Sequence, residues 1–307
     1  MHLNNIQIRN INTESDLEEF TEFFNLAHAD YPEYNDLTTD IIREHVFDAP
    51  DFVVGSNFLA LDGSRIVGRG RADFIDNSST IIIRVLPEFR NTYGIEEMLY
   101  DAMMNYLAPN DLKIHRTTIL SQFKKDIAFF ESKNFKEKNR QYTMNRDMSQ
   151  PVEKPVFSDG MNVRTPDLKK EYDAVKAVLV NGFSNGVDDT AELEIYFDKF
   201  TKRNFSQESV LTVGNSNGAL VGICVASIHP AIEDKGVIPW LAVLKEYRGK
   251  GLGKALLLAG LERFKGMEKI KKAELCVDLD NPNALKLYKG VGFEVVTETV
   301  MLEKKID

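Results

Sequence analysis

The feature that most constrains the fold of this chain is an internal duplication. The early segment IQIRNINTESDLEEFTEFFNLA resembles MNVRTPDLKKEYDAVKAVLVNGF in the second half, and FLALDGSRIVGRGRADFI resembles VLTVGNSNGALVGICVASI. The first pair is typical of a strand, a polar turn and an amphipathic helix, and the second pair of a hairpin with an Asp-Gly or Asn-Gly turn. The elements recur at an offset of about 155–158 residues, which is too long for a solenoid repeat. We therefore predict two α+β domains that share one fold.

A linker is predicted between the two copies. Residues 149–160 contain two prolines and a Ser-Asp-Gly turn signal, and few periodic apolar residues. This places the first domain at residues 1–148 and the second at 161–307. A chain of 307 residues also exceeds the usual size of one domain.

Charge and composition limit the classes of partner. The net charge is −9, of which residues 1–150 carry −8 and residues 151–307 carry −1. A basic footprint for nucleic acid is therefore missing, whereas a cationic small substrate is compatible with this balance. No apolar run approaches the ~20 residues that span a bilayer, so we expect a cytoplasmic protein with no membrane partner. Cys224 and Cys276 lack metal-ligand spacing, so we expect buried thiols and no metal. The oligomeric state is not indicated.

The stretch YRGKGLGKAL, from Tyr247 to Leu256, predicts an anion site. It follows the apolar strand VIPWLAV and leads into a helix that begins near Leu252. The first N–H groups of a helix lack internal partners and carry partial positive charge, and glycines let a phosphate approach them. A dinucleotide fingerprint fails because Leu256 replaces its third glycine, and a P-loop fails because Ala255 follows Gly253-Lys254.

A second motif accompanies this turn. Arg-x-x-Gly-x-Gly is formed by Arg248, Gly251 and Gly253, and about thirty residues later the chain has NPNALKLYKGVGF. Together the two motifs resemble the GNAT superfamily of acyl-CoA-dependent N-acetyltransferases, and the whole chain resembles tandem-GNAT enzymes, in which the second domain carries the activity. The resemblance implies an α+β fold of two tandem domains. Each would have a twisted, mostly antiparallel mixed sheet that splays between strands 4 and 5, with flanking helices.

The resemblance also implies acetyl-CoA as cosubstrate and roles for individual residues. Pantetheine would bind the strand edge, the diphosphate would bind the turn, and backbone N–H near Val243 would polarise the thioester oxygen. Tyr288 stands at the position of the general acid, although it also fits a packed aromatic of a core helix. Asn281 fits a coenzyme contact and a plain helix N-cap before Pro282. The residues implied for coenzyme binding are Ala242, Val243, Leu244, Arg248, Gly249, Lys250, Gly251, Leu252, Gly253, Lys254, Asn281 and Ala284.

The acceptor and the base are less well marked. The stretch GVIPWLAV has no carboxylate, and His229, Glu233 and Asp234 lie upstream of it, so we assign no base. The segment NGFSNGVDDTAELEIYF, which carries Asp188, Asp189, Glu192 and Glu194, would suit a cationic amine, but a solvated helix start explains these acids as well and is the favoured interpretation.

The first half has lost the groups that carry chemistry. Tyr93 and Ile95 stand opposite Gly251 and Gly253, where their bulky side chains would block the close approach of an anion, and Phe130 stands opposite Tyr288. We expect this domain to keep the fold without catalysis and to close or select for the acceptor pocket, although Gly94 leaves residual CoA binding open. The predicted function is transfer of an acetyl group to a primary amine of a small molecule. The alternatives are an acetyltransferase for protein N-termini or lysines, and a non-catalytic acyl-CoA-binding regulatory module.

Overall fold

The structure is a computed structural model that describes residues 6–183, 193–194, 197–198, 201 and 206–306. The chain forms two compact units. The first consists of Met1–Gln141 with Thr297–Asp307, and the second of Tyr142–Val296.

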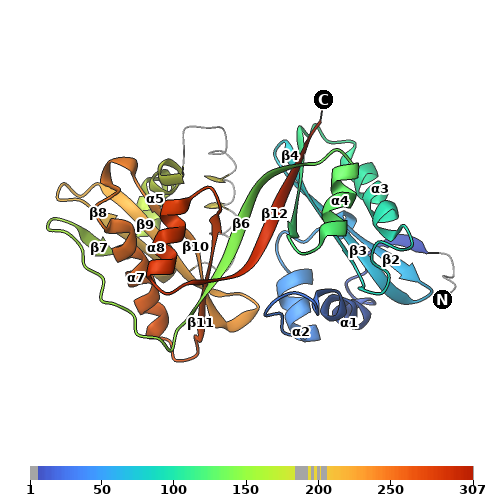
Figure 1. Cartoon of the computed structure of the whole chain (residues 1–307), viewed down its shortest axis with the longest axis horizontal. Helices are drawn as coiled ribbons and strands as arrows, with labels where there is room; N and C mark the ends of the chain where they lie inside the picture. Colours follow the sequence, from blue (N-terminus) through green and yellow to red (C-terminus); the bar gives the residue numbers. More distant parts are fainter. Residues whose placement is uncertain (1–5, 184–192, 195–196, 199–200, 202–205, 307) are drawn as a thin grey trace. The chain divides into compact units, whose positions relative to one another are not determined.

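The described elements follow the same order in the two halves of the sequence (Figure 1). The order is strand, helix, three strands, helix, strand, helix, strand, with short helical turns between. The first half contains β1 (Gln7–Asn10), α1 (Leu17–His28), α2 (Thr39–Ile42), η1 (Arg43–Phe47), η2 (Val54–Ser56), β2 (Asn57–Asp62), β3 (Arg65–Ile75), β4 (Ser78–Val85), α3 (Ile95–Leu107), β5 (Ile114–Leu120), α4 (Lys124–Ser132) and β6 (Lys136–Asp147). The second half contains β7 (Asn162–Arg164), α5 (Leu168–Phe183), η3 (Gln207–Ser209), β8 (Val210–Gly214), β9 (Leu220–His229), β10 (Ile232–Val243), η4 (Lys245–Tyr247), α7 (Leu252–Lys265), β11 (Lys272–Asp278), α8 (Pro282–Gly290) and β12 (Glu294–Lys305).

Each unit has a mixed, mostly antiparallel sheet. The strand order is β1-β2-β3-β4-β5-β12 in the first unit and β7-β8-β9-β10-β11-β6 in the second. The fourth and fifth strands are parallel in both units but pair over only three residues, from Ser78 to Thr80 in β4 and from Lys235 to Val237 in β10. Beyond these residues the strands part, which confirms the predicted α+β fold with a splay.

The last strand of each half lies in the sheet of the other unit. β12 pairs antiparallel with β5 from Thr299 to Lys305, and the end of β6 lies beside β11. Compactness divides the chain at Gln141 and at Val296, so residues 149–160 lie within the second unit. The boundaries at residues 148 and 161 stay a prediction. Proline and turn signals mark where a loop runs, but they do not tell which sheet edge a later strand will join.

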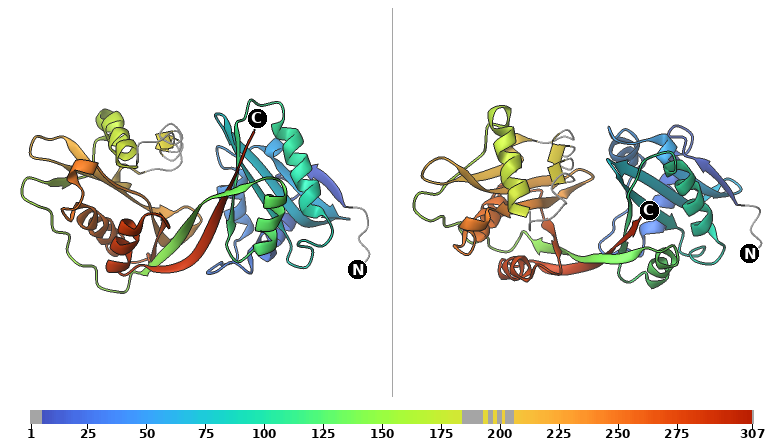
Figure 2. Two further views of the ribbon diagram at one scale, coloured as in Figure 1. Left: turned by 45° about the horizontal axis from the view of Figure 1, so that its top comes forward. Right: turned by 90° about the horizontal axis from the view of Figure 1, so that it is seen from above.

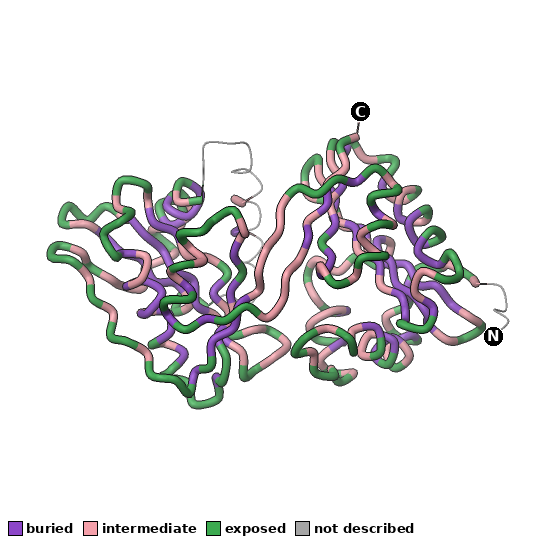
Figure 3. Tube along the Cα trace, viewed as in Figure 1, coloured by how far each residue is buried: buried purple, intermediate pink, exposed green. Residues whose placement is uncertain are grey.

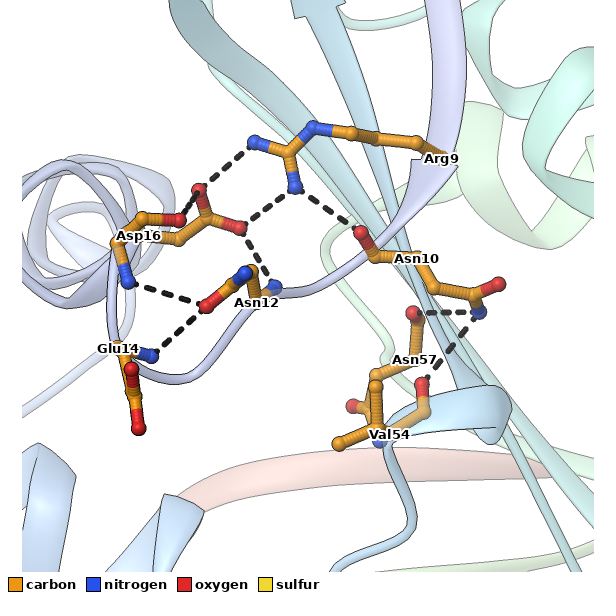
Figure 4. A network of polar contacts seen from close by, with 8 residues as sticks. Arg9, Asn10, Asn12, Glu14, Asp16, Val54 and Asn57 are labelled. Atoms are coloured by element: carbon orange, nitrogen blue, oxygen red, sulfur yellow. Dashed lines mark hydrogen bonds and ion pairs between the residues drawn. The ribbon is translucent and has the colours of Figure 1, made fainter.

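An ion pair between the first strand and the first helix is duplicated. The guanidinium group of Arg9 donates to both carboxylate oxygens of Asp16 at 2.6 and 2.7 Å, beside the start of α1 (Figure 4). Asp16 also accepts the backbone N–H of Asn12 at 2.8 Å. At an offset of 155 residues, Arg164 donates to both oxygens of Glu171 at 2.7 and 2.5 Å. The same anchor of helix to strand thus survives in both copies.

Helices cover both faces of each sheet (Figure 2). In the second unit, α7 and α5 both pack on β9 and β10. Small residues allow the close approach: a Cβ at Gly236 would lie 2.7 Å from Phe264 of α7, and a Cβ at Gly182 of α5 would lie 2.7 Å from Ala242. The buried residues run along the strands and the inner faces of the helices (Figure 3). Among the described residues, no helix has the length and apolar character needed to cross a membrane.

Candidate coenzyme and acyl-transfer site

The site is built around the free end of β10. The pairing of β10 with β9 shifts between Val237 and Trp240, so β10 carries an extra residue in a β-bulge. Pro239 lies in this bulge, where the N–H that proline lacks is not needed for the ladder. The equivalent strand of the first unit, β4, pairs with β3 without any shift. The bulge is therefore a feature of the second unit alone.

The backbone of Val243 faces the splay. Val243 lies opposite Gly222 of β9, and the next residue, Leu244, donates its N–H to the carbonyl of Val221 at 3.0 Å. This makes Val243–Gly222 a non-hydrogen-bonded pair, so the N–H and C=O of Val243 point away from β9 and toward the β11 side. The side chain of Ala242 is buried against α5. The geometry thus presents a backbone donor to the space between the parted strands.

Arg248 fastens the turn to its surroundings. Its Nε donates to the carbonyl of Val243 at 2.9 Å, and its Nη2 donates to the carbonyl of Gly182 at 2.5 Å. Its own backbone N–H is bonded to the carbonyl of Lys245 at 3.3 Å. The side chain that the motif singles out therefore holds strand, helix and turn together, and its N–H is already engaged.

The glycines shape the turn. Gly249 has φ 76° and Gly251 has φ 80°, a region that residues with a Cβ rarely adopt. Left-handed residues alternating with extended or helical ones direct successive N–H groups to one side and form an anion-binding concavity.

The start of α7 continues this concavity. The first intrahelical bond runs from the N–H of Ala255 to the carbonyl of Gly251 at 3.0 Å, so the N–H groups of Leu252, Gly253 and Lys254 have no partner within the helix. The first turn of α7 carries no acidic residue that could occupy these groups. A Cβ at Gly253 would lie 3.7 Å from Leu287, an ordinary contact. Packing therefore does not require a glycine at position 253. The missing side chain instead leaves the free N–H groups at the start of α7 uncovered.

The two lysines of the turn have other partners. Nζ of Lys250 donates to the carbonyl of Glu246 at 3.3 Å and lies 5.6 Å from the ring centroid of Tyr247. Nζ of Lys254 forms an ion pair with Glu153 at 2.7 Å. Lys250 is exposed and the side chain of Lys254 is 44% exposed, so each would contribute about 1 kcal/mol or less to the binding of an anion at the turn.

Tyr288 lies on α8 as a largely buried phenol. It is 8% exposed, and its ring centroid lies 6.1 Å from that of Phe293. Burial, together with the nearby thiols of Cys224 and Cys276, raises the pKa of Tyr288 to about 12. The phenol is thus protonated at neutral pH and can donate a proton. The position is both a packed aromatic and a competent O–H donor, so the two sequence interpretations are compatible.

Asn281 caps α8. Its Oδ1 accepts the backbone N–H of Ala284 at 3.1 Å, and Pro282 follows at the first helical position. This is the N-cap role that the sequence allowed. Coenzyme contacts by Asn281 and Ala284 stay a prediction.

The corresponding turn of the first unit is occupied by its own carboxylate. Arg90 donates to the carbonyl of Val85 at 3.4 Å, as Arg248 does to Val243. However, the N–H of Asn91 donates to Glu96 at 2.7 Å, and Glu96 is 7% exposed. A second anion at this turn would meet that carboxylate. Glu96 was missed in the sequence, although an acid in the first turn of a helix, here two residues after Gly94, is a known signal.

The expectation for Ile95 at this turn needs correction. Ile95 does not obstruct it, because Ile95 is 0% exposed and a Cβ on Gly68 would lie 2.9 Å from its side chain, so it packs into the core. Tyr93 is exposed and packs on Phe89, with ring centroids 5.8 Å apart. The carboxylate of Glu96 occupies the turn, and the side chain of Ile95 does not.

The predicted acidic acceptor segment lies largely outside the described residues, including Asp188, Asp189 and Glu192. Glu194 is described and lies 3.7 Å from Lys176. In the part of the chain that the structure describes, no group of three or more His, Cys, Asp or Glu side chains could hold a metal ion.

Comparisons with known proteins place this site in a family. Residues 177–293, which contain the turn, the splayed strand and Tyr288, match the model of the acetyltransferase (GNAT) family. The mycothiol acetyltransferase of Saccharomonospora viridis is 29% identical over 157 residues, covering 48% of this chain and 50% of that protein. The chain thus spans about half the length of the curated relatives it matches.

Solved structures show the fold over nearly the whole chain. A GCN5-related N-acetyltransferase from Sphaerobacter thermophilus superposes with a TM-score of 0.81 at 16% identity, covering 98% of this chain and 95% of that one. A tandem GNAT protein from the clavulanic acid biosynthesis pathway gives a TM-score of 0.75 at 17% identity, covering 98% of both chains. The tandem-GNAT architecture predicted from the duplication is therefore confirmed.

Proposed function

We propose that the second unit is an acetyl-CoA-dependent N-acetyltransferase that acts on a primary amine of a small molecule. The observation that carries the proposal is the contrast between the two turns. The turn at residues 249–254 has left-handed glycines and open amides, whereas the copy in the first unit bonds Asn91 to Glu96. The diphosphate of the coenzyme would accept N–H bonds from this turn, and the pantetheine arm would lie along the parted end of β10.

The residues present fit each part of the reaction. The N–H of Val243 faces the splay, where it would donate to the thioester oxygen as negative charge develops during attack by the amine. Tyr288 would donate its phenolic proton to the departing thiolate of the coenzyme. Its high pKa keeps that proton in place at neutral pH. The amine loses its own proton to solvent or to a base that we do not assign.

The acceptor is the least constrained part. The curated relatives include mycothiol acetyltransferases, which supports a small-molecule acceptor. The acidic balance of the chain suits a cationic amine.

Thiol release from acetyl-CoA, measured against a panel of polyamines, aminoglycosides and amino sugars, tests the proposal. We expect amine-dependent release of free thiol with at least one small amine. Acetylation of peptide N-termini or lysines alone would instead identify a protein acetyltransferase. Saturable CoA binding without any amine-dependent thiol release would identify a binding module.

A further inference from the structure

A pair of arginines in the first unit is unused by the proposed reaction. Arg69 of β3 and Arg84 of β4 lie directly opposite each other in the antiparallel register. Side chains of such a pair project from the same face of the sheet, with Cβ atoms about 4.5–5.5 Å apart. Cζ of Arg69 lies 5.0 Å from the ring centroid of Phe20, and Cζ of Arg84 lies 5.4 Å from that of Tyr31. Both guanidinium groups therefore lie beneath α1 and the segment that follows it.

Among the described residues, no carboxylate is in direct contact with either arginine, although the charge of Asp73 acts on Arg69. Arg69 is 8% exposed, donates from Nη2 to Oδ1 of Asn57 at 2.7 Å, and has a buried Nε without a hydrogen-bond partner. Arg84 donates from Nη1 to the carbonyl of Ile83 at 2.8 Å, and its Nε is buried without a partner too. Within the described part of the chain, no carboxylate forms an ion pair with either of them. Like charges placed directly opposite each other in a sheet are destabilising.

Two of the carboxylates nearby are in ion pairs, whereas Glu96 and Asp126, which line a pocket with Arg84, accept hydrogen bonds from Asn91. Asp73 forms an ion pair with Arg71 at 2.6 Å, and Asp30 forms one with Arg90 at 2.7 Å.

The neighbouring imidazole of His28 carries no charge. His28 stacks on Phe24, with ring centroids 4.2 Å apart. Burial, with the nearby Arg84 and Arg69, lowers the pKa of His28 to about 4, so the ring is neutral. The half of the chain with the larger acidic excess thus contains a buried guanidinium group, that of Arg69, and a half-buried one, that of Arg84, and no described carboxylate forms an ion pair with either.

We propose that Arg69 and Arg84 bind the carboxylate or phosphate group of a small molecule on the α1-covered face of the first unit. Guanidinium groups bind both kinds of oxyanion in bidentate geometry, and they are the side chains of choice where the ion pair is desolvated. The aromatic rings of Phe20 and Tyr31 pack against the two guanidinium groups, whose Nε atoms have no hydrogen-bond partner among the described residues. The first unit would then be a binding module for an anionic molecule.

Calorimetry on the full chain tests this assignment, with inorganic phosphate and succinate as the two probes. We expect saturable binding of at least one probe, and the preferred probe tells phosphate from carboxylate recognition. Arg84→Met should weaken that binding at least tenfold, and Arg84→Lys should weaken it less. Arg65→Met is the matched control, because Arg65 lies on the same strand as Arg69 in an exposed pair with Glu88 and should bind as wild type does.

Thermal denaturation supplies a second readout that does not depend on tight binding. Without added anion, Arg84→Met should melt at or above the wild-type temperature, because it removes a like-charge contact. The bound probe should raise the melting temperature of the wild type but not that of Arg84→Met. The proposal is overturned if neither probe binds saturably, or if Arg84→Met binds and responds to the probe as Arg65→Met does.

Discussion

Replacing Tyr288 by Phe isolates the step in which the thiolate leaves. The change removes one oxygen from a ring that is 8% exposed. Among the described residues, the hydroxyl makes no hydrogen bond that would be lost. The first unit already has a buried Phe130 at the equivalent position, 3% exposed. We therefore expect the free energy of unfolding to change by less than about 1 kcal/mol and the affinity for CoA to stay within about threefold of wild type.

The rate should respond differently. A positioned general acid contributes about 10²–10⁴-fold, which corresponds to about 3–5 kcal/mol of activation free energy. Since burial raises the pKa of Tyr288 to about 12, the phenol stays protonated up to about pH 10. The loss in kcat of Tyr288→Phe should therefore be nearly constant from pH 6 to pH 10.

Thiol release under saturating acetyl-CoA measures this loss, with calorimetry for CoA affinity and thermal denaturation for stability. Tyr142→Phe is the control, because Tyr142 packs at the edge of the same core. The reasoning is refuted if Tyr288→Phe turns over within about twofold of the control, or if its rate falls only in proportion to a loss of folded protein.

Three further predictions follow from the two turns and the duplicated anchor. Gly253→Ala should raise the free energy of unfolding by about 0.5–1 kcal/mol, because its Cβ has room, yet weaken CoA binding at least tenfold by calorimetry; unchanged affinity would contradict the open-turn argument. Wild-type protein should bind one CoA per chain. Glu96→Gln should leave that number at one, because the turn of the first unit still lacks glycines at the positions equivalent to Gly251 and Gly253. Two equivalent sites in the wild type would contradict the assignment of a single coenzyme site. The hydrogen bonds from Arg164 hold the pKa of Glu171 at about 2, below its unfolded value of about 4.3. This stabilisation is present above pH 4.3 and is lost as the pH falls toward 2. Glu171→Gln should thus flatten acid unfolding followed by circular dichroism, and superimposable curves would rule this out.

Much of the fold could be predicted from the sequence, because its signals are local. Hairpin turns, apolar periodicity and the repeated order of elements defined two copies of one fold, and the glycine turn at Gly249–Gly253 indicated where the helix start would be open. The exchange of β6 and β12 could not be predicted in this way. β6 and β12 follow equivalent helices. Which sheet each of them joins depends on whether it lies beside β5 or beside β11 in three dimensions, and this is not encoded in the local sequence.

The site shows the same division between local and tertiary information. The cap formed by Asn281 and the left-handed glycines follow from residue type and spacing. The role of Arg248 does not, because its acceptors are the backbone carbonyls of Val243 and Gly182, and Gly182 lies 66 residues earlier. Likewise, nothing in the spacing of Arg69 and Arg84 reveals that the register places them opposite each other.

A crystal structure of the chain with acetyl-CoA tests the central claim most directly. We expect one coenzyme per chain, with its diphosphate on the amides of residues 249–254 and its thioester oxygen within hydrogen-bonding distance of the N–H of Val243. A coenzyme seated at the turn between Asn91 and Glu96, or a thioester remote from β10, would contradict the account.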